Sequence, residues 1–209
     1  MTYHELDLHW QKIFEMEWNS LCEGSKAIAA LIISDTGEII SEGRNKIGTV
    51  QIPNPRVLHA EVEAVRNLDI QKHPFLHQYT LVTALEPCPM CMGTLIMGGI
   101  RHVIIGAKDD YGGAMDLINH SAFLKSKNVE VLWMDQIYGD IQRALQTIRE
   151  LLFYNDTESL NEKLRDFSVY NRKGVQAAEK LIENGIFRDK APADYRIDEI
   201  FDQLAALIE

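Results

Sequence analysis

Residues 85–93 read LEPCPMCMG and are the most informative stretch of the chain. They follow an apolar, β-rich segment at 79–84 and open a run that ends at Gly98-Gly99. Proline suits the first turn of a helix, because its missing N–H would have no partner there. The stretch therefore predicts a strand, a short turn, and a helix whose first turn carries two cysteines.

Cys88 and Cys91 are two of the three cysteines in the chain, and their C-x-x-C spacing has three chemical interpretations. A zinc ribbon needs a second such pair, and only Cys22 remains, so that interpretation fails. A thiol redox pair at a helix N-terminus, where the helix dipole lowers the thiolate pKa, stays open. The third interpretation is a mixed-ligand zinc site, which needs an imidazole from elsewhere in the chain.

His59 supplies that imidazole at the start of a helix predicted over 57–68. The pattern H-x-E followed at a distance by P-C-x-x-C is typical of zinc deaminases. His59, Cys88 and Cys91 would leave the fourth tetrahedral position of Zn²⁺ to water. Glu61, two residues beyond His59, would take a proton from that water and pass it to the substrate. The motifs together predict a zinc-dependent hydrolytic deaminase that releases ammonia.

Hydrophobic periodicity predicts an α/β domain around these motifs. The expected elements, in order, are a helix over 3–23, strands over 26–34 and 38–43, the helix over 57–68, a strand over 79–84, a helix over 88–97, a strand over 101–107, a short helix over 121–127, a strand over 129–134 and a long helix through 137–152. Strand–helix alternation after an opening hairpin predicts a three-layer αβα fold with a mixed five-stranded sheet. The last two strands should be parallel, since a helix connects them.

The chain changes character after about residue 155. We expect one domain over 1–154 and a helical C-terminal extension over 155–209, whose two helical patterns are separated at Ala191-Pro192. The apolar stripes of these helices must pack on the domain, on each other or on a second subunit.

Composition limits the class of protein and its partners. With 209 residues, 46% of them hydrophobic, the chain is long enough to bury a core without disulfides. It lacks a membrane-length apolar run and a basic N-terminal region, so we expect a cytoplasmic protein with reduced thiols. The net charge is −10, from 21 Lys and Arg against 31 Asp and Glu. This charge gives no help to binding a nucleic-acid backbone.

Several motifs together resemble a known family, the cytidine and deoxycytidylate deaminase superfamily, and within it the branch of tRNA adenosine deaminases and guanine deaminases. The resemblance spans residues 5–154. It rests on 59–61 and 85–93, on Gly43-Arg44-Asn45, which is similar to the family's G-x-N, and on 101–114, which resembles the strand and loop that follow. It implies a cytidine-deaminase-like fold, the ligand set and proton shuttle named above, and a homodimer.

The resemblance also implies substrate contacts. Asn45 would hydrogen-bond the substrate, while the Ala60 N–H and the carbonyl near Pro87 would hold the ring and the departing amine. Asp109 and Asp110 could reach the rim of the pocket and bind purine N–H groups. Two alternatives remain open from the residues alone: Asn45 could cap its own loop, and Asp109 could belong to a solvated acidic loop. The candidates for an aromatic lid are Tyr111, Phe123 and Phe153.

Departures from the family pattern bear on the substrate. Leu58 stands where the tRNA-editing members have a small alanine, and Phe153-Tyr154 is followed by Asn155-Asp156 rather than by arginines. With the negative net charge, this favours a small aminated nucleobase or nucleoside, such as guanine or adenine, over tRNA. The alternatives are adenosine-to-inosine editing of tRNA, a redox module using Cys88 and Cys91, and a zinc-stabilised binding module. Glu61 argues against the last, because a structural zinc site has no use for an unliganded carboxylate.

Overall fold

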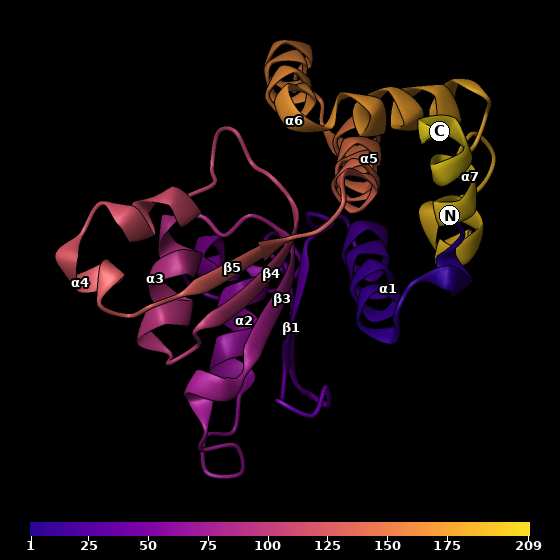
Figure 1. Cartoon of the computed structure of the whole chain (residues 1–209). Helices are drawn as coiled ribbons and strands as arrows, with labels where there is room; N and C mark the ends of the chain where they lie inside the picture. Colours follow the sequence, from indigo (N-terminus) through magenta and orange to yellow (C-terminus); the bar gives the residue numbers. More distant parts are fainter.

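A mixed five-stranded sheet forms the centre of the computed structural model, which describes residues 1–209 (Figure 1). The strands lie in the order β2-β1-β3-β4-β5. Their bounds are β1 Ala29–Ile33, β2 Ile39–Arg44, β3 Thr80–Leu85, β4 His102–Ala107 and β5 Glu130–Trp133. β1 pairs antiparallel with both β2 and β3, whereas β3–β4 and β4–β5 are parallel pairs. The expected hairpin and the expected parallel final pair are both confirmed.

Helices cover both faces of this sheet, which confirms the three-layer arrangement (Figure 1). On one face lie α2 (Ala60–Asn67) and α3 (Pro89–Met97). On the other lie α1 (Leu8–Cys22) and α5 (Gln136–Phe153), while the short α4 (Ala122–Lys125) precedes β5. The side chains of β1 alternate between two buried cores, with Leu31 beneath α1 and α5 and Ile32 beneath α2. A strand buried on both faces explains the unbroken apolar run in its sequence.

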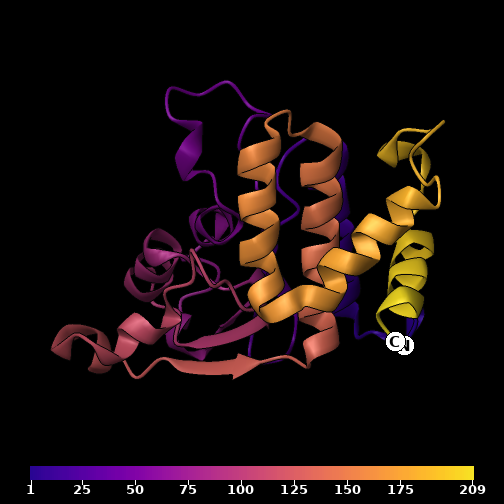
Figure 2. The same ribbon diagram turned by 90° about the horizontal axis from the view of Figure 1, so that it is seen from above.

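The C-terminal extension consists of α6 (Thr157–Glu183) and α7 (Ile197–Ile208), and it packs on the α1–α5 side of the domain (Figure 2). Phe201 of α7 meets Phe14 of α1 with ring centroids 5.2 Å apart. Leu181 of α6 and Phe201 belong to the same buried core as Trp10. The apolar stripes of the extension are therefore buried within this chain.

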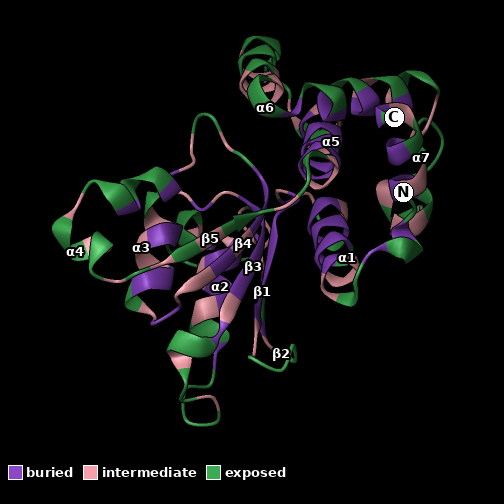
Figure 3. Ribbon diagram, viewed as in Figure 1, coloured by how far each residue is buried: buried purple, intermediate pink, exposed green.

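α6 is kinked at Asn171, whose backbone leaves helical geometry with φ −127° and ψ 46°. The Asn171 side chain donates to the Lys108 carbonyl and accepts from Gln136 Nε2. Before the kink, residues 157–170 contain no fully buried side chain; after it, α6 buries Val175, Ala178 and Leu181 (Figure 3). A Cβ at Gly174 would lie 2.0 Å from the Asp140 carbonyl oxygen, so only glycine permits this contact.

The chain ends lie side by side (Figure 2), where the Met1 amino group contacts Glu209 Oε1 at 3.0 Å. None of the helices is both long enough and apolar enough to cross a membrane.

Candidate active site

Two helix N-termini bring the three metal-ligand candidates together. His59 is the N-cap residue of α2, Cys88 is the N-cap of α3, and Cys91 lies in the first turn of α3. A close contact between β2 and α2 fixes one of these helices, because a Cβ at Gly43 would lie 2.1 Å from the Ala60 carbonyl oxygen. The glycine of the G-x-N motif therefore has a packing role.

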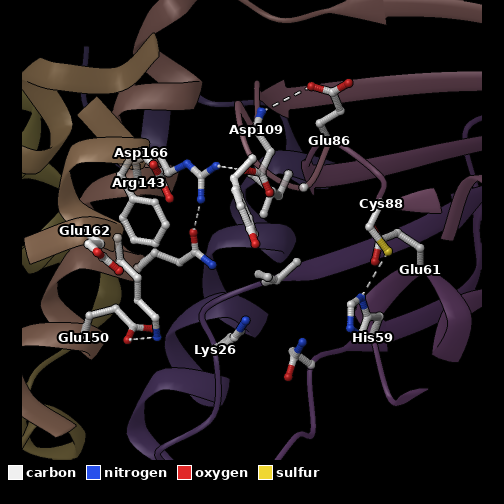
Figure 4. Close-up of a pocket in the computed structure, with 18 of the residues that line it drawn as sticks. Lys26, His59, Glu61, Glu86, Cys88, Asp109, Arg143, Glu150, Glu162 and Asp166 are labelled. Carbon is white, nitrogen blue, oxygen red and sulfur yellow. Dashed lines mark hydrogen bonds and ion pairs between the residues drawn. The ribbon is translucent and has the colours of Figure 1, made fainter. Parts of the chain in front are cut away.

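The three side chains form a compact donor set. His59 Nδ1 lies 3.7 Å from Cys88 Sγ (Figure 4). Cys91 Sγ lies 3.4 Å from both His59 Nδ1 and Cys88 Sγ. Tetrahedral zinc, with bonds of ~2.0–2.3 Å to nitrogen and sulfur, needs donors separated by about this much. The donor set therefore fits zinc in both composition and spacing.

The electrostatics of the thiols also fit a cation. A hydrogen bond from Cys91 and a further one from His59 lower the pKa of Cys88 to about 4. The Cys88 thiolate and burial in turn raise the pKa of Cys91 far above its ordinary value. Alone, the pair therefore holds one thiolate, whereas a divalent cation between the sulfurs would let both ionise.

Glu61 lies beside this donor set without belonging to it. Its carboxyl is almost completely buried, and Oε2 lies 3.3 Å from Cys91 Sγ. Burial raises the pKa of Glu61 to about 7. A carboxyl with a pKa near neutrality is suited to both accepting and returning a proton.

A pocket of about 450 Å³ extends from the donor set to the C-terminal helices (Figure 4). His59, Glu61 and Cys88 line one end. The opposite wall comes from α5 and from the part of α6 before the kink. Its residues are Arg143, Gln146 and Glu150 of α5 with Ser159, Glu162, Lys163, Asp166 and Phe167 of α6.

Asn45 lines this pocket with a buried side-chain amide whose Nδ2 has no hydrogen-bond partner. Its Oδ1 accepts from Ser25 Oγ at 3.0 Å and from the Ile47 N–H at 3.0 Å. Its Nδ2 is buried and has no hydrogen-bond partner. The loop-capping role and the substrate-binding role considered from the sequence are therefore compatible, because they use opposite ends of the amide.

The predicted backbone contacts, Ala60 and Pro87, are chain neighbours of pocket-lining residues but do not line the pocket themselves. As the first residue of α2, Ala60 has an N–H without a partner inside the helix. The Pro87 carbonyl accepts from the Ala114 N–H at 3.0 Å, which leaves one lone pair. Glu86 holds the next loop, since its carboxylate accepts from the backbone N–H groups of Asp109 and Met115 at 3.2 Å each.

Asp109 and Tyr111 both line the pocket, Asp109 as part of an ion pair and Tyr111 as an exposed side chain. Asp109 Oδ1 pairs with Arg143 Nη2 at 3.0 Å, so its carboxylate is already engaged. Tyr111 is 86% exposed at the mouth. Phe123 and Phe153, the other lid candidates, are absent from the lining, and Phe167 stands there instead, 4.4 Å from the Arg143 guanidinium.

Sequence reasoning missed the α5–α6 wall and Lys26. The polar residues of α5 fall on the face opposite Ile141, Leu145 and Ile148, the face that normally meets solvent. The available signal was the polar face of α5 taken together with Leu160, Leu164 and Phe167 at helical spacing in the extension. For Lys26, no local pattern points to a pocket.

Comparison with known proteins matches residues 5–107 to a family model described as the cytidine and deoxycytidylate deaminase zinc-binding region. The chain is 36% identical over 94 residues to the tRNA-specific adenosine deaminase of Haemophilus influenzae, covering 44% of this chain and 52% of that one. It is also 36% identical over 89 residues to the tRNA(Ile)-lysidine synthase of Deinococcus radiodurans, covering 42% of this chain and 15% of that one.

The fold is similar to that of the solved guanine deaminase from Nitrosomonas europaea, with a TM-score of 0.52 and 18% identity. That match covers 66% of this chain and 82% of the other. The chain spans about half the length of the tRNA deaminase that it matches, and 15% of the lysidine synthase. The redox interpretation of Cys88 and Cys91 finds no support in these similarities. Residues 5–107, which carry both motifs, match the zinc-binding region of the cytidine and deoxycytidylate deaminases.

Proposed function

We propose that the protein is a zinc-dependent hydrolase that replaces the amino group of a small nucleobase or nucleoside with oxygen and releases ammonia. A purine such as guanine or adenine is the favoured base. The observation that carries the proposal is the convergence of three zinc donors and a buried, unliganded carboxylate at one end of a substrate-sized pocket.

His59, Cys88 and Cys91 would hold the metal. When bound, zinc would supply Lewis acidity that lowers the pKa of a coordinated water toward ~7. Glu61 would accept a proton from water at its carboxylate and deliver it to the ring nitrogen next to the reacting carbon. It would then take the second proton from the hydroxyl group added to that carbon and pass it to the amine, which leaves as ammonia as the carbonyl forms. Asn45 would donate from its free Nδ2 to an acceptor on the substrate, while Ala60 and Pro87 would offer a backbone donor and acceptor.

The pocket wall supports a small substrate over tRNA. Residues 157–170 of α6 lie opposite the donor set and would stand in the path of an RNA loop. Two unpaired carboxylates on this segment, Glu162 and Asp166, line the pocket and would repel a phosphate backbone. Enzymes that bind RNA draw on released counterions and thus on clustered basic side chains. The two basic side chains of this wall, Arg143 and Lys163, are each already paired with a carboxylate.

The test is ammonia release from free bases, nucleosides and a tRNA anticodon arm, measured with zinc-loaded protein at matched salt. We expect turnover of a small purine compound and no salt-sensitive binding of the RNA. Inosine formation in the anticodon arm with strong, salt-sensitive binding would instead establish tRNA as the substrate.

Replacing Glu61 with glutamine tests the chemistry of the site. Glu61→Gln should retain zinc and fold and lose about 10²–10⁴-fold in kcat, because removing a general acid–base has roughly that effect. Near-normal turnover by this variant would exclude Glu61 as the proton shuttle. The control is Glu158→Gln, at the exposed start of α6. Glu63, on the same helix as Glu61, is unsuitable because it is buried.

A further inference from the structure

Asn45 is engaged within the protein through all its hydrogen-bonding groups except one. Its backbone N–H donates to the Ile28 carbonyl at 2.9 Å, and its backbone carbonyl accepts from Ser20 Oγ at 3.2 Å. The side-chain oxygen Oδ1 accepts from Ser25 Oγ and from the Ile47 N–H, at 3.0 Å each. The Nδ2 group, buried in the lining of the pocket, has no partner. The residue is therefore held through every group except the one that can donate to a ligand.

The two donors on Oδ1 determine which end of the amide stays free. The last torsion of an asparagine side chain has broad minima, so the amide takes its orientation from its surroundings. Because a backbone N–H can only donate, the Ile47 N–H requires the amide oxygen to face it and turns Nδ2 the other way. The Ser25 hydroxyl adds a second hydrogen bond to the same oxygen from a different segment of the chain. One donor would leave the amide free to pivot, whereas two donors fix its plane.

The end of α1 fixes the position of Ser25. Gly24, with a φ of +83°, follows the helix, and its N–H donates to the Leu21 carbonyl at 2.8 Å. The Ser25 N–H donates to the Ser20 carbonyl at 2.9 Å, which completes the pair of hydrogen bonds of a Schellman cap. Ser25 is also fully buried. Its hydroxyl therefore reaches Asn45 from a capped helix end.

The Ser25 hydroxyl has one hydrogen and two acceptors within reach. Besides Asn45 Oδ1, the Ile47 carbonyl lies 3.1 Å from Ser25 Oγ. Donation to that carbonyl alone would leave lone pairs of the hydroxyl facing lone pairs of Oδ1. Donation to Oδ1, alone or shared with the carbonyl, avoids this repulsion, so Ser25 acts on the amide.

We infer that Ser25 is a positioning residue of the proposed deaminase, which holds the Asn45 amide so that Nδ2 donates to an acceptor atom of the nucleobase. The inference rests on the proposed function, since it assumes that the base lies between Asn45 and Glu61. Ser25 does not line the pocket and acts only through Asn45. The substrate must accordingly present a lone pair, from a ring nitrogen or a carbonyl oxygen, on the edge that faces this amide.

A double-mutant cycle on ligand binding tests whether Ser25 acts through Asn45. Equilibrium binding of guanine and of adenine is measured with zinc-loaded Glu61→Gln protein, in which turnover does not intervene. The same measurement is made after adding Ser25→Ala, Asn45→Ala or both. For the purine that binds, Ser25→Ala should weaken binding about 3- to 10-fold, the effect of one neutral hydrogen bond, and Asn45→Ala about 10- to 100-fold. Once position 45 is alanine, Ser25→Ala should change binding by less than about twofold, because no amide remains to be held.

The polarity of the amide is tested by Asn45→Asp. A carboxylate keeps the acceptor for Ser25 Oγ and for the Ile47 N–H, and it replaces the free donor with a second acceptor. This variant should therefore lose purine binding at least as much as Asn45→Ala while keeping the contacts that hold the loop. Parent-like purine binding by Asn45→Asp would mean that the ligand does not use the donor, and would overturn the inferred orientation.

Steady-state kinetics separate positioning from a loss of folded protein. With Glu61 intact, Ser25→Ala should raise KM about 3- to 10-fold and leave kcat within about threefold, because the lost contact serves bound substrate and transition state alike. A purely structural defect would lower the active fraction and thus the apparent kcat, without raising KM. Ser41→Ala is the matched control and should bind like the parent, since it removes a buried hydroxyl that donates to the Ala64 carbonyl at 2.6 Å, outside the pocket lining.

Unchanged purine binding in Ser25→Ala, or the same loss with and without the Asn45 amide, would overturn the positioning role. Unchanged binding in Asn45→Ala would overturn it too, because there would be no contact to position. An intact cycle, together with no ammonia release from any base or nucleoside by the protein with Glu61 intact, would overturn the deaminase function and leave the positioning of the bound base in place. The two failures are therefore distinguishable.

Discussion

Glu17 is a carboxyl group in a place that suits a neutral side chain. It lies on α1 facing α5, its side chain is fully buried, and neither carboxylate oxygen has a hydrogen-bond partner. Burial raises the pKa of Glu17 well above 4.5, although Gln142 and Arg143 act in the opposite direction. The folded protein therefore favours the protonated form of this group.

The sign of its effect on stability follows from that shift. Because the pKa is higher in the folded state, the stabilising contribution is complete below about pH 4.5 and is lost as pH rises through the folded pKa. Glu17→Gln should raise the free energy of unfolding by ~1–3 kcal/mol at pH 8 and leave it nearly unchanged at pH 4. Urea unfolding at pH values from 4 to 8 measures the free energy of unfolding of the variant and the parent. Glu15→Gln, at an exposed position of the same helix, is the control. Parallel pH curves for Glu17→Gln and parent would show that Glu17 titrates normally.

Cys88 should link metal content to stability, because metal binding is coupled to folding. Cys88→Ala should lose zinc and lower the midpoint of thermal unfolding together. Cys22→Ala, at the remaining cysteine outside the donor set, should retain full zinc content. Metal analysis and calorimetry of the same samples check both, and full zinc occupancy in Cys88→Ala would rule out the proposed ligand set.

Individual helices and strands of the domain could be predicted from sequence because their signals are local. β3 and β4 are apolar runs bounded by turn residues, and α3 begins at a proline and ends at a glycine pair. The polar face of α5 did not indicate a pocket, since a helix with one apolar stripe normally turns its other face to solvent. Here α6 covers that face, so Arg143 and Gln146 are buried by a contact distant in sequence.

The three zinc-ligand candidates and Glu61 were identifiable because the chemistry requires a fixed spacing within each of two short motifs. Lys26 and the α6 wall were not, because their place in the pocket depends on where α6 packs. The packing of α6 on α5 depends on Gly174, so a substitution at this position tests it.

Gly174→Ala should separate α6 from α5. Its Cβ would meet the Asp140 backbone, which cannot move aside as a flexible side chain would, and overpacking of this kind costs ~1–3 kcal/mol. Gly93→Ala, in α3 with nothing within 4 Å of its Cβ, is the matched substitution and should stabilise by ~0.5–1 kcal/mol. Chemical denaturation of both variants gives the comparison; similar effects in the two would mean that the α5–α6 contact adjusts.

The homodimer expected from the family resemblance remains a prediction at the scale of the whole molecule. The apolar stripes of the extension no longer argue for it, because they are buried within the chain. Other apolar side chains remain exposed, among them Leu132 on the edge strand β5, 58% exposed, and Met97 at the end of α3, 73% exposed. Sedimentation equilibrium should show a dimer, and Met97→Lys and Leu132→Lys should identify which surface it uses. A monomer at all concentrations would contradict the expectation.

The kink at Asn171 also divides α6 into segments that should exchange amide hydrogens at different rates. Backbone hydrogen bonds at 157–170 are covered by half-buried side chains, whereas those beyond the kink lie over a packed core. Local opening of the first segment therefore requires less free energy than global unfolding. Hydrogen–deuterium exchange should show early labelling of 157–170, slow labelling of 172–183, and protection of the first segment once a ligand fills the pocket. The wall that encloses the substrate would then also be the part of the molecule that opens to admit it, while the domain and its donor set stay folded.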